Sequence, residues 1–303
     1  MKPLRIKTIS EFHKLHLLEP PDHPLISVVD YAKVAAAKGP HPIPFVADYY
    51  SVSVKRGLSG KMRYGQQEYD FDEGIMYFMA PGQVLQPSPP NTKGTQPSGW
   101  ILLIHPDFLW NTPLAKNIRQ YGYFDYAIHE ALFLSDKEEA IINGIVQNIQ
   151  QEARTNIDRF TQNIIISQLE TLFNYAERFY QRQFITRKVS SHKILDRLEQ
   201  YLDNYFRQGQ VHEKGLPTVQ SIADALNTSS SYLSALLKSL TGQNTQQHIH
   251  NKLIEIAKEK LSTTDLSVSE IAYELGFEHP QSFNKLFKAK TSLSPLAFRQ
   301  SFN

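Results

Sequence analysis

The segment Ile222-Ala223-Asp224-Ala225-Leu226 recurs further along the chain as Ile271-Ala272-Tyr273-Glu274-Leu275. The residues that follow also correspond, with Leu233, Leu237 and Lys238 recurring as Phe283, Phe287 and Lys288. The offset between the copies is constant up to the turn and grows by one after it, so the second copy has one additional turn residue. Each copy has the pattern of a helix, a short turn and a second helix, which predicts a duplicated helix-turn-helix.

Residues typical of helix starts and stops flank each predicted helix. They are Thr218, Ser230 and Gly242 in the first unit, and Ser267, Glu270, Gly276 and Pro280 in the second. Ser267 and Glu270 form a capping box, and Pro280 opens a helix at a position where its missing N–H is not needed. We therefore expect helix-turn-helix units at residues 218–240 and 267–290.

One predicted helix, residues 246–261, separates the two units and acts as a spacer. Its apolar positions recur three and four residues apart, and its length is about 24 Å at 1.5 Å per residue. Recognition helices in successive major grooves on one face of DNA lie about 34 Å apart, which this spacer and the width of the units together can reach. The arrangement predicts a partner of double-stranded DNA.

The second helix of each unit supplies the candidate DNA-binding residues. They are Ser230, Ser231, Ser234, Ala235 and Lys238 in the first unit, and Gln281, Ser282, Asn284, Lys285 and Lys288 in the second. Gln suits adenine and Lys suits guanine in the major groove, whereas short serines reach bases poorly. We expect direct base readout mainly from the second unit, and phosphate contacts and shape reading from the first. Each serine is equally interpretable as a helix cap or a solvated residue.

The charge of residues 190–303 is nearly balanced, so a basic face requires Lys238, Lys285, Lys288, Lys290 and Arg299 to gather on one side. DNA binding should then be modest in affinity and strongly dependent on salt.

Short β-like segments with Gly and Pro between them fill the first half and indicate a small sandwich or barrel. They are residues 25–29, 45–55, 61–71, 74–79 and 100–104, preceded by an irregular stretch, 1–24, that is interpretable as an arm. His41 and His105 are isolated, so the spacing favours no metal site. No Gly-rich phosphate loop or nucleophile elbow occurs, and we expect neither enzymatic activity nor a cofactor.

Aromatic residues on these strands are candidates for lining a small-molecule pocket. The candidates are Phe45, Tyr49, Tyr64, Tyr69 and Trp100. The alternative for each ring is a place in the core of the β-domain.

The middle of the chain is predicted to be helical. Ser135 and Glu138 form a capping box before one helix, and a second helix is expected from about residue 157 to 183. The second helix carries a short heptad seam of Ile165, Leu169, Leu172, Ala176 and Phe179. The seam is either a dimer contact, which we favour, or the face that packs on the protein's own β-domain.

Composition places the chain among ordinary globular proteins. The net charge is +2, cysteine is absent, and no apolar run is long enough to cross a membrane. The start of the chain has no apolar signal core, and we expect a cytoplasmic protein of about two domains.

Residues 193–301 resemble the DNA-binding domain of the AraC/XylS family of bacterial transcription regulators. The resemblance rests on Ile222-Ala223, Ser231-Tyr232-Leu233-Ser234, Lys238-x-x-x-Gly242, Ala257-x-x-x-Leu261, Ile271-Ala272-x-x-x-Gly276-Phe277, Phe283-x-x-x-Phe287-Lys288 and Ser294-Pro295-x-x-x-Arg299. Two positions depart from the family pattern, which usually has Arg at Lys252 and Gly at Ser292. The first half is similar to cupin-like sensor domains only in its pattern of short β-like segments.

The resemblance implies an α+β multidomain protein. Its parts are a cupin-like β-barrel sensor domain (residues 1–134), a helical dimerisation or packing segment (135–185), a linker (186–192) and an all-α DNA-binding domain (193–303). It further implies a ligand-responsive activator that binds a small-molecule effector, forms a homodimer and acts on RNA polymerase. Two alternatives stay open: a cupin-like enzyme with an accessory helical domain, and a regulator whose β-domain binds a protein.

Overall fold

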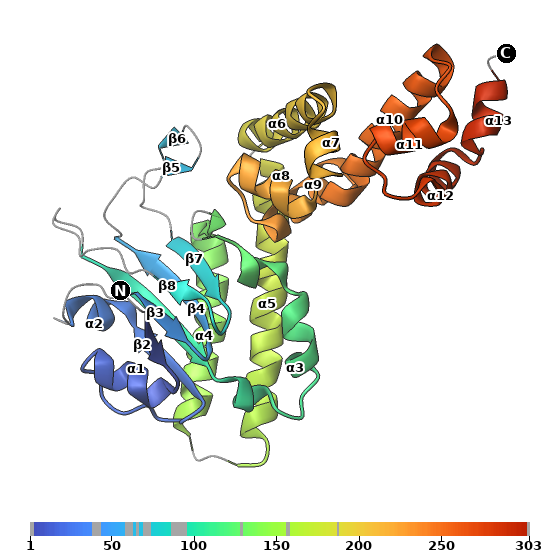
Figure 1. Ribbon diagram of the computed structural model, residues 1–303. Coiled ribbons are helices and arrows are strands. Elements are labelled where there is room, and N and C mark those ends of the chain that lie inside the picture. Colours follow the sequence, from blue (N-terminus) through green and yellow to red (C-terminus); the bar gives the residue numbers. More distant parts are fainter. Residues whose placement is uncertain are drawn as a thin grey trace. The chain divides into compact units, whose positions relative to one another are not determined.

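The computed structural model describes residues 3–37, 44–57, 63–64, 67–68, 74–85, 96–127, 130–155, 158–186 and 188–301. The chain divides into two compact units, Met1–Gln183 and Phe184–Asn303. The first unit is sheet-rich and the second is helical, so the protein has the mixed α+β organisation that the sequence predicts (Figure 1).

Three sheets occur in the described part of the first unit. A five-stranded sheet has the order β10-β7-β4-β9-β2, a three-stranded sheet has the order β1-β3-β8, and β5 pairs with β6. The strands are β1 (Leu4–Ile6), β2 (Ile26–Asp30), β3 (Phe45–Ala47), β4 (Tyr50–Arg56), β5 (Arg63–Tyr64), β6 (Gln67–Glu68), β7 (Gly74–Met79), β8 (Val84–Leu85), β9 (Ser98–Ile104) and β10 (Leu132–Leu134).

Helices and helical turns surround these sheets. They are α1 (Ile9–Leu15), α2 (Tyr31–Ala36), η1 (Pro106–Leu109), α3 (Leu114–Asn117), η2 (Ile118–Gln120), η3 (Gly122–Asp125), α4 (Asp136–Arg154) and α5 (Thr161–Thr186). We interpreted residues 1–24 as an arm, but the described part, residues 3–24, contains regular structure. Their strand β1 pairs in parallel with β3, and Thr8 forms a capping box with Glu11 at the start of α1.

The two faces of the five-stranded sheet have different partners, because successive side chains of a strand point in opposite directions. On β9, Ile101 and Leu103 pack in a cluster with Ile9 and Phe12 of α1. Trp100 lies on the opposite face, where its indole N–H donates to Asn143 of α4 at 2.7 Å. The sheet is therefore covered by α1 on one side and by α4 on the other.

Two sets of polar contacts, one partly buried and one buried, attach the helices to the sheet. Arg56 at the end of β4 donates to both carboxylate oxygens of Glu139 on α4, at 2.7–3.1 Å. The buried side-chain amide of Gln183 on α5 accepts from the Phe133 N–H at 2.9 Å and donates to the Ala131 carbonyl at 3.2 Å. Gln183 thus hydrogen-bonds the backbone at strand β10 much as a neighbouring strand would.

The heptad seam of α5 is buried inside its own unit. The exposed fraction is at most 5% for each of Ile165, Leu169, Leu172, Ala176 and Phe179. The assignment of a dimer contact to these five residues is therefore wrong, because side chains that the chain already covers are not available to a partner. The heptad spacing marks the face that the helix buries, and here that face packs on the rest of the unit.

The second unit consists of helices. They are α6 (Lys188–Arg207), α7 (Gln210–Lys214), α8 (Val219–Leu226), α9 (Ser230–Thr241), α10 (Thr245–Thr263), α11 (Val268–Glu274), α12 (Pro280–Thr291) and α13 (Pro295–Gln300). Residues 188–192, which we expected in a linker, belong to α6. One hydrophobic core joins residues of α6, α8, α9, α10, α11 and α12, so both helix-turn-helix units fold around the same apolar centre.

No helix in the described ranges is long and apolar enough to cross a membrane. Among those same residues, no group of three or more His, Asp or Glu is placed to hold a metal ion. His105 is the N-cap of η1, where its ring nitrogen accepts from the Asp107 N–H, and His41 lies outside the described residues.

Replacement of Gln183 by Leu should destabilise the first unit. The substitution removes two hydrogen bonds from a buried site and leaves a side chain that cannot replace them, which costs about 2–3 kcal/mol. Differential scanning calorimetry of the full chain should show a lower transition temperature. Gln181→Leu is the matched control on the same helix, since Gln181 is partly exposed and bonds only to Glu177. Equal stability of the Q183L and Q181L proteins would contradict the structural role of Gln183.

Candidate nucleic-acid interface

The second helix-turn-helix, α11 and α12, is shaped by residues that the sequence indicates. Ser267 and Glu270 form the capping box of α11 through bonds of 3.2 and 2.7 Å. Gly276 then turns the chain at a φ of +82°, and a β-carbon there would collide with Val211 of α7. Pro280 begins α12, as predicted. The turn therefore needs glycine both for its backbone angle and for the close approach of α7.

Helix α12 has one buried face and one exposed face. Phe283 and Phe287 are at most 1% exposed and pack in the shared core. The remaining predicted residues, Gln281, Ser282, Asn284, Lys285 and Lys288, are all exposed. Within the described residues, no hydrogen bond or ion pair engages their side chains. A 12-residue helix of about 18 Å thus presents a polar, basic face with its donors uncommitted.

The corresponding helix of the first helix-turn-helix, α9, is more deeply buried than α12. Ser230, Ser231, Ser234 and Ala235 are only partly exposed. The hydroxyl of Ser230 donates to Gln220 at 2.8 Å, and the hydroxyl of Ser234 lies 3.0 Å from that of Thr245. Ser229, not Ser230, caps the helix, because its side chain accepts from the Tyr232 N–H. Of the predicted residues on this helix, only Lys238 is exposed.

Several cations of the unit are already committed to protein partners. Lys252 contacts Asp203 of α6 at 2.6 Å and Glu255 at 2.8 Å, and hydrogen bonding from Lys252 lowers the pKa of Asp203. Arg299, which we expected on the basic face, donates instead to the carbonyls of Leu261 and Leu266 at 3.1 and 2.6 Å. Lys290 donates to Asn251 at 3.1 Å. The uncommitted cations of the candidate interface are thus Lys238, Lys285 and Lys288 within the described residues.

Residues 222–301 match a family described as a helix-turn-helix domain. The C-terminal unit carries an AraC-type helix-turn-helix domain.

Relatives of the chain are named as transcription regulators. This chain is 30% identical over 130 residues to the raffinose operon transcriptional regulatory protein RafR of Pediococcus pentosaceus. The matched stretch covers 43% of this chain and 44% of RafR. It is 26% identical over 154 residues to the transcriptional activator RhaS of an Enterobacter species, covering 51% of this chain and 55% of RhaS. The chain therefore spans about half the length of these relatives.

A similar solved structure is the DNA-binding domain of AdpA, a global transcriptional factor, in complex with a target DNA. The two share 25% identity over 35% of this chain and 91% of that domain, with a TM-score of 0.31.

The backbone is strained at the end of α12 in the AraC-type domain. Ser292 ends α12 with a φ of +64°, a left-handed conformation. At the corresponding position, the end of α9, the first helix-turn-helix has Gly242 with a φ of +74°. Their amide N–H groups make the same bond, to the carbonyls of Lys288 and Lys238, each at 2.9 Å. A residue with a β-carbon is disfavoured by about 1–2 kcal/mol in this conformation. The departure of Ser292 from the family pattern therefore has a measurable cost.

Ser292→Gly should stabilise the AraC-type domain by about 0.5–1 kcal/mol, because removal of the strain exceeds the added freedom of glycine in the unfolded chain. Gly242→Ser is the reciprocal control, since no atom lies within 4 Å of a β-carbon built there and only the backbone angle is disfavoured. Calorimetry of the full chain should show a higher transition temperature for S292G and a lower one for G242S. A lower transition temperature for S292G would contradict the prediction.

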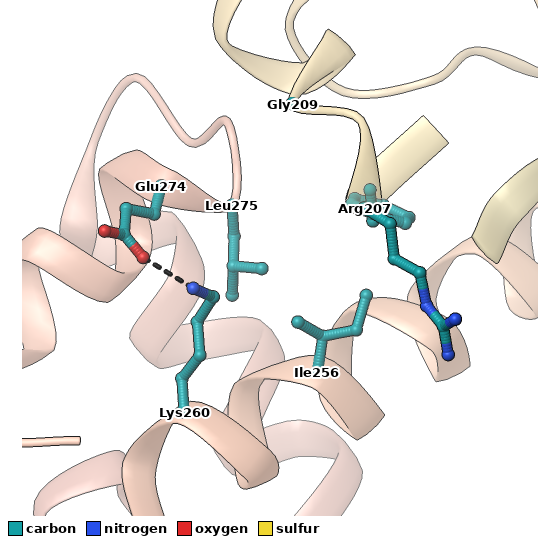
Figure 2. Close-up of a pocket in the computed structure, with 7 residues that line it drawn as sticks. Arg207, Gly209, Ile256, Lys260, Glu274 and Leu275 are labelled. Atoms are coloured by element: carbon teal, nitrogen blue, oxygen red, sulfur yellow. Dashed lines mark hydrogen bonds and ion pairs between the residues drawn. The ribbon is translucent and has the colours of Figure 1, made fainter. Parts of the chain in front are cut away.

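A small pocket of about 250 Å³ lies within the second compact unit, and none of its lining residues belongs to α12 (Figure 2). The pocket is lined by seven residues: Phe206, Arg207, Gly209, Ile256, Lys260, Glu274 and Leu275. Lys260 of α10 and Glu274 of α11 form an ion pair at 2.7 Å on one side, and Arg207 lies on the other. The ion pair attaches α11 to the spacer helix α10 and so helps to position the second helix-turn-helix.

The aromatic residues predicted to line a ligand pocket do not come together. Tyr49 and Phe45 pack on the α1 side of the five-stranded sheet, whereas Trp100 faces α4. The side chain of Tyr64 and all of Tyr69 lie outside the described residues. Tyr49 is a core residue at 1% exposure, and burial, with the charges of Glu11 and Asp48, raises the pKa of its hydroxyl. A pocket shared by Phe45, Tyr49 and Trp100 is therefore excluded by the two-sided geometry of the sheet.

A different group of residues in the sheet-rich unit, formed by Lys55, Tyr31 and Tyr77, was not predicted from the sequence. The available signal was a lysine near the end of a strand in which Val52 and Val54 alternate with serines.

Proposed function

We propose that the protein is a sequence-specific transcription regulator that binds double-stranded DNA through its AraC-type domain. The observation that carries the proposal is the exposed face of α12, where five polar or basic side chains have no partner among the described residues while Phe283 and Phe287 anchor the helix. Side chains with free donors on a rigid helix are what readout in the major groove requires.

The spacer geometry supports the same proposal. Helix α10 has 19 residues and is about 28 Å long. It contacts α9, α11, α12 and α13, so both recognition helices are held by one rigid element. Rigid placement is needed if two helices are to enter successive major grooves about 34 Å apart.

We further propose unequal roles for the two recognition helices. Ser230 and Ser234 of α9 are engaged with Gln220 and Thr245, so they have little capacity left to select bases. Gln281, Asn284 and Lys285 of α12 are long, exposed and free to do so. In this proposal α12 supplies most base contacts, and α9 with Lys238 supplies phosphate contacts and shape reading.

The first unit is proposed as a cupin-like sensor domain whose small-molecule effector changes the DNA-bound population of the regulator. Activation through RNA polymerase and homodimer formation are parts of the proposal that rest on the family resemblance. A dimer contact must use surfaces other than the α5 seam. The named relatives are regulators, which favours this function over a cupin-like enzyme.

Binding-site selection from random DNA with the full chain tests the proposal. We expect a recovered consensus, and gel shifts should show tighter binding to it than to shuffled DNA. Affinity should fall steeply between low and physiological salt, because the contacts to phosphate release counterions. Absence of any preference over random DNA would overturn sequence-specific binding.

Lys285→Ala and Lys288→Ala should have distinguishable effects on DNA binding. Loss of a base contact in K285A should cost about 1–3 kcal/mol on the selected site and relax preference at one base step. Loss of a phosphate contact in K288A should weaken selected and random DNA equally and lower the slope of log affinity against log salt by about one. Titration of both variants on both DNAs measures this. Equal weakening by K285A on both DNAs would make Lys285 a phosphate contact only.

A further inference from the structure

Lys55 is the penultimate residue of strand β4, in the sheet-rich first unit. The strand alternates, so that Ser53 and Lys55 lie on the face opposite to Val52 and Val54. Register places Ser53 opposite Tyr77 on β7 and Ile101 on β9, and Ile101 belongs to the cluster on the α1 side of the sheet. Lys55 therefore shares the α1 side with Tyr77, on the face away from α4.

Two tyrosine rings flank the ammonium group. The Lys55 Nζ lies 5.0 Å from the centre of the Tyr31 ring, on α2, and 5.4 Å from the centre of the Tyr77 ring, on β7. Both distances are within the range of a cation–π contact. Three separate elements, α2, β4 and β7, thus converge on one positive charge.

The charge has no carboxylate partner in the part of the chain that the structure describes. The neighbouring Arg56 points to the other face and pairs with Glu139, and Asp30 caps α2 through the Ala32 N–H. Burial lowers the pKa of Lys55 to about 8, so the ammonium form still predominates at neutral pH. An ammonium group removed from water without an anion is unfavourable, and Lys55 as a whole residue is half-buried.

The two phenols complement this cation without neutralising it. Burial raises the pKa of Tyr31 and of Tyr77, so both hydroxyls keep their protons. They cannot serve as anions for Lys55, but they can donate hydrogen bonds to one. Ser53, which is 4% exposed and lies opposite Tyr77, adds a further hydroxyl to the same face.

We propose that Lys55, Tyr31 and Tyr77 bind the carboxylate of a small organic acid, which is the effector of the sensor unit. The inference rests on the proposed sensing role of that unit and specifies its ligand chemistry. A monoanion matches the single cation, whereas a phosphate dianion would be left with excess charge. The rings beside Lys55 provide apolar surface for the body of the acid.

Thermal shift and isothermal titration calorimetry on the full chain test the site. The probes are benzoate, 3-phenylpropionate and hexanoate, their neutral amides, and inorganic phosphate. We expect at least one carboxylate to bind, and its amide and phosphate to bind at least about tenfold more weakly. Lys55→Met should weaken carboxylate binding at least about tenfold, since it removes the charge and keeps the apolar stem. Lys55→Arg should retain most of the binding.

Lys33→Met is the matched control, because Lys33 is an exposed lysine on α2, two residues from Tyr31. It should leave carboxylate affinity within about twofold of the wild type. K55M also removes the two cation–π contacts, so the ligand-free variant should melt somewhat below the wild type but still in one cooperative transition.

Failure of all three carboxylates to bind at millimolar concentration, or equal binding by wild type and K55M, would overturn the proposal. Tighter binding of phosphate than of any carboxylate would assign the wrong class of anion and have the same consequence. The assay contains no DNA, so its result is independent of DNA binding. A protein that binds a carboxylate but selects no DNA sequence refutes the regulator and keeps the site. A protein that selects a DNA sequence but binds no carboxylate keeps the proposed regulator and refutes the carboxylate site.

Discussion

The second unit depends on one hydrophobic core shared by both helix-turn-helix copies. Residues of α10 lie at its centre, with Ile222 and Leu233 from the first copy and Ile271 and Phe283 from the second. Because each copy is too short to bury an apolar face alone, neither is expected to be stable without the spacer helix. The same packing serves the proposed function, since a helix held on a rigid core can keep its exposed residues at a fixed position on DNA.

Polar contacts then decide which charges are available to a partner. Lys252 and Lys260 attach α10 to α6 and α11, and Arg299 attaches α13 to the end of α10 and to the segment after it. Lys285 and Lys288 are left on the exposed face of α12. A unit with nearly balanced charge can therefore present a basic face, because its acidic residues neutralise the structural cations. Net charge alone would not reveal this partition.

Local features of the fold were predictable from the sequence because they depend on neighbouring residues. The capping boxes at Ser135 and Ser267, the start of α12 at Pro280 and the strand at residues 74–79 all follow from short-range chemistry. Features that depend on topology were not. The heptad seam of α5 showed that one face is buried but not what covers it. Phe45 and Trp100 were grouped by composition, yet Phe45 of β3 packs in the cluster on the α1 side of the five-stranded sheet, whereas Trp100 of β9 faces α4. Ser292 was identified as a departure, but only the structure shows that the helix keeps its left-handed end there.

Lys55 illustrates why a functional residue can be hidden from sequence patterns. A lysine in a strand usually indicates a solvent-facing or edge position. Here β4 lies between β7 and β9, and the lysine is flanked by two tyrosines. The unfavourable desolvation of its ammonium raises the free energy of the ligand-free unit, so an anion that compensates the charge stabilises only the folded, bound state. A sensor requires this difference in affinity between states, because a ligand that interacts equally with every state shifts no equilibrium. The uncompensated charge is thus the property that would make the unit responsive.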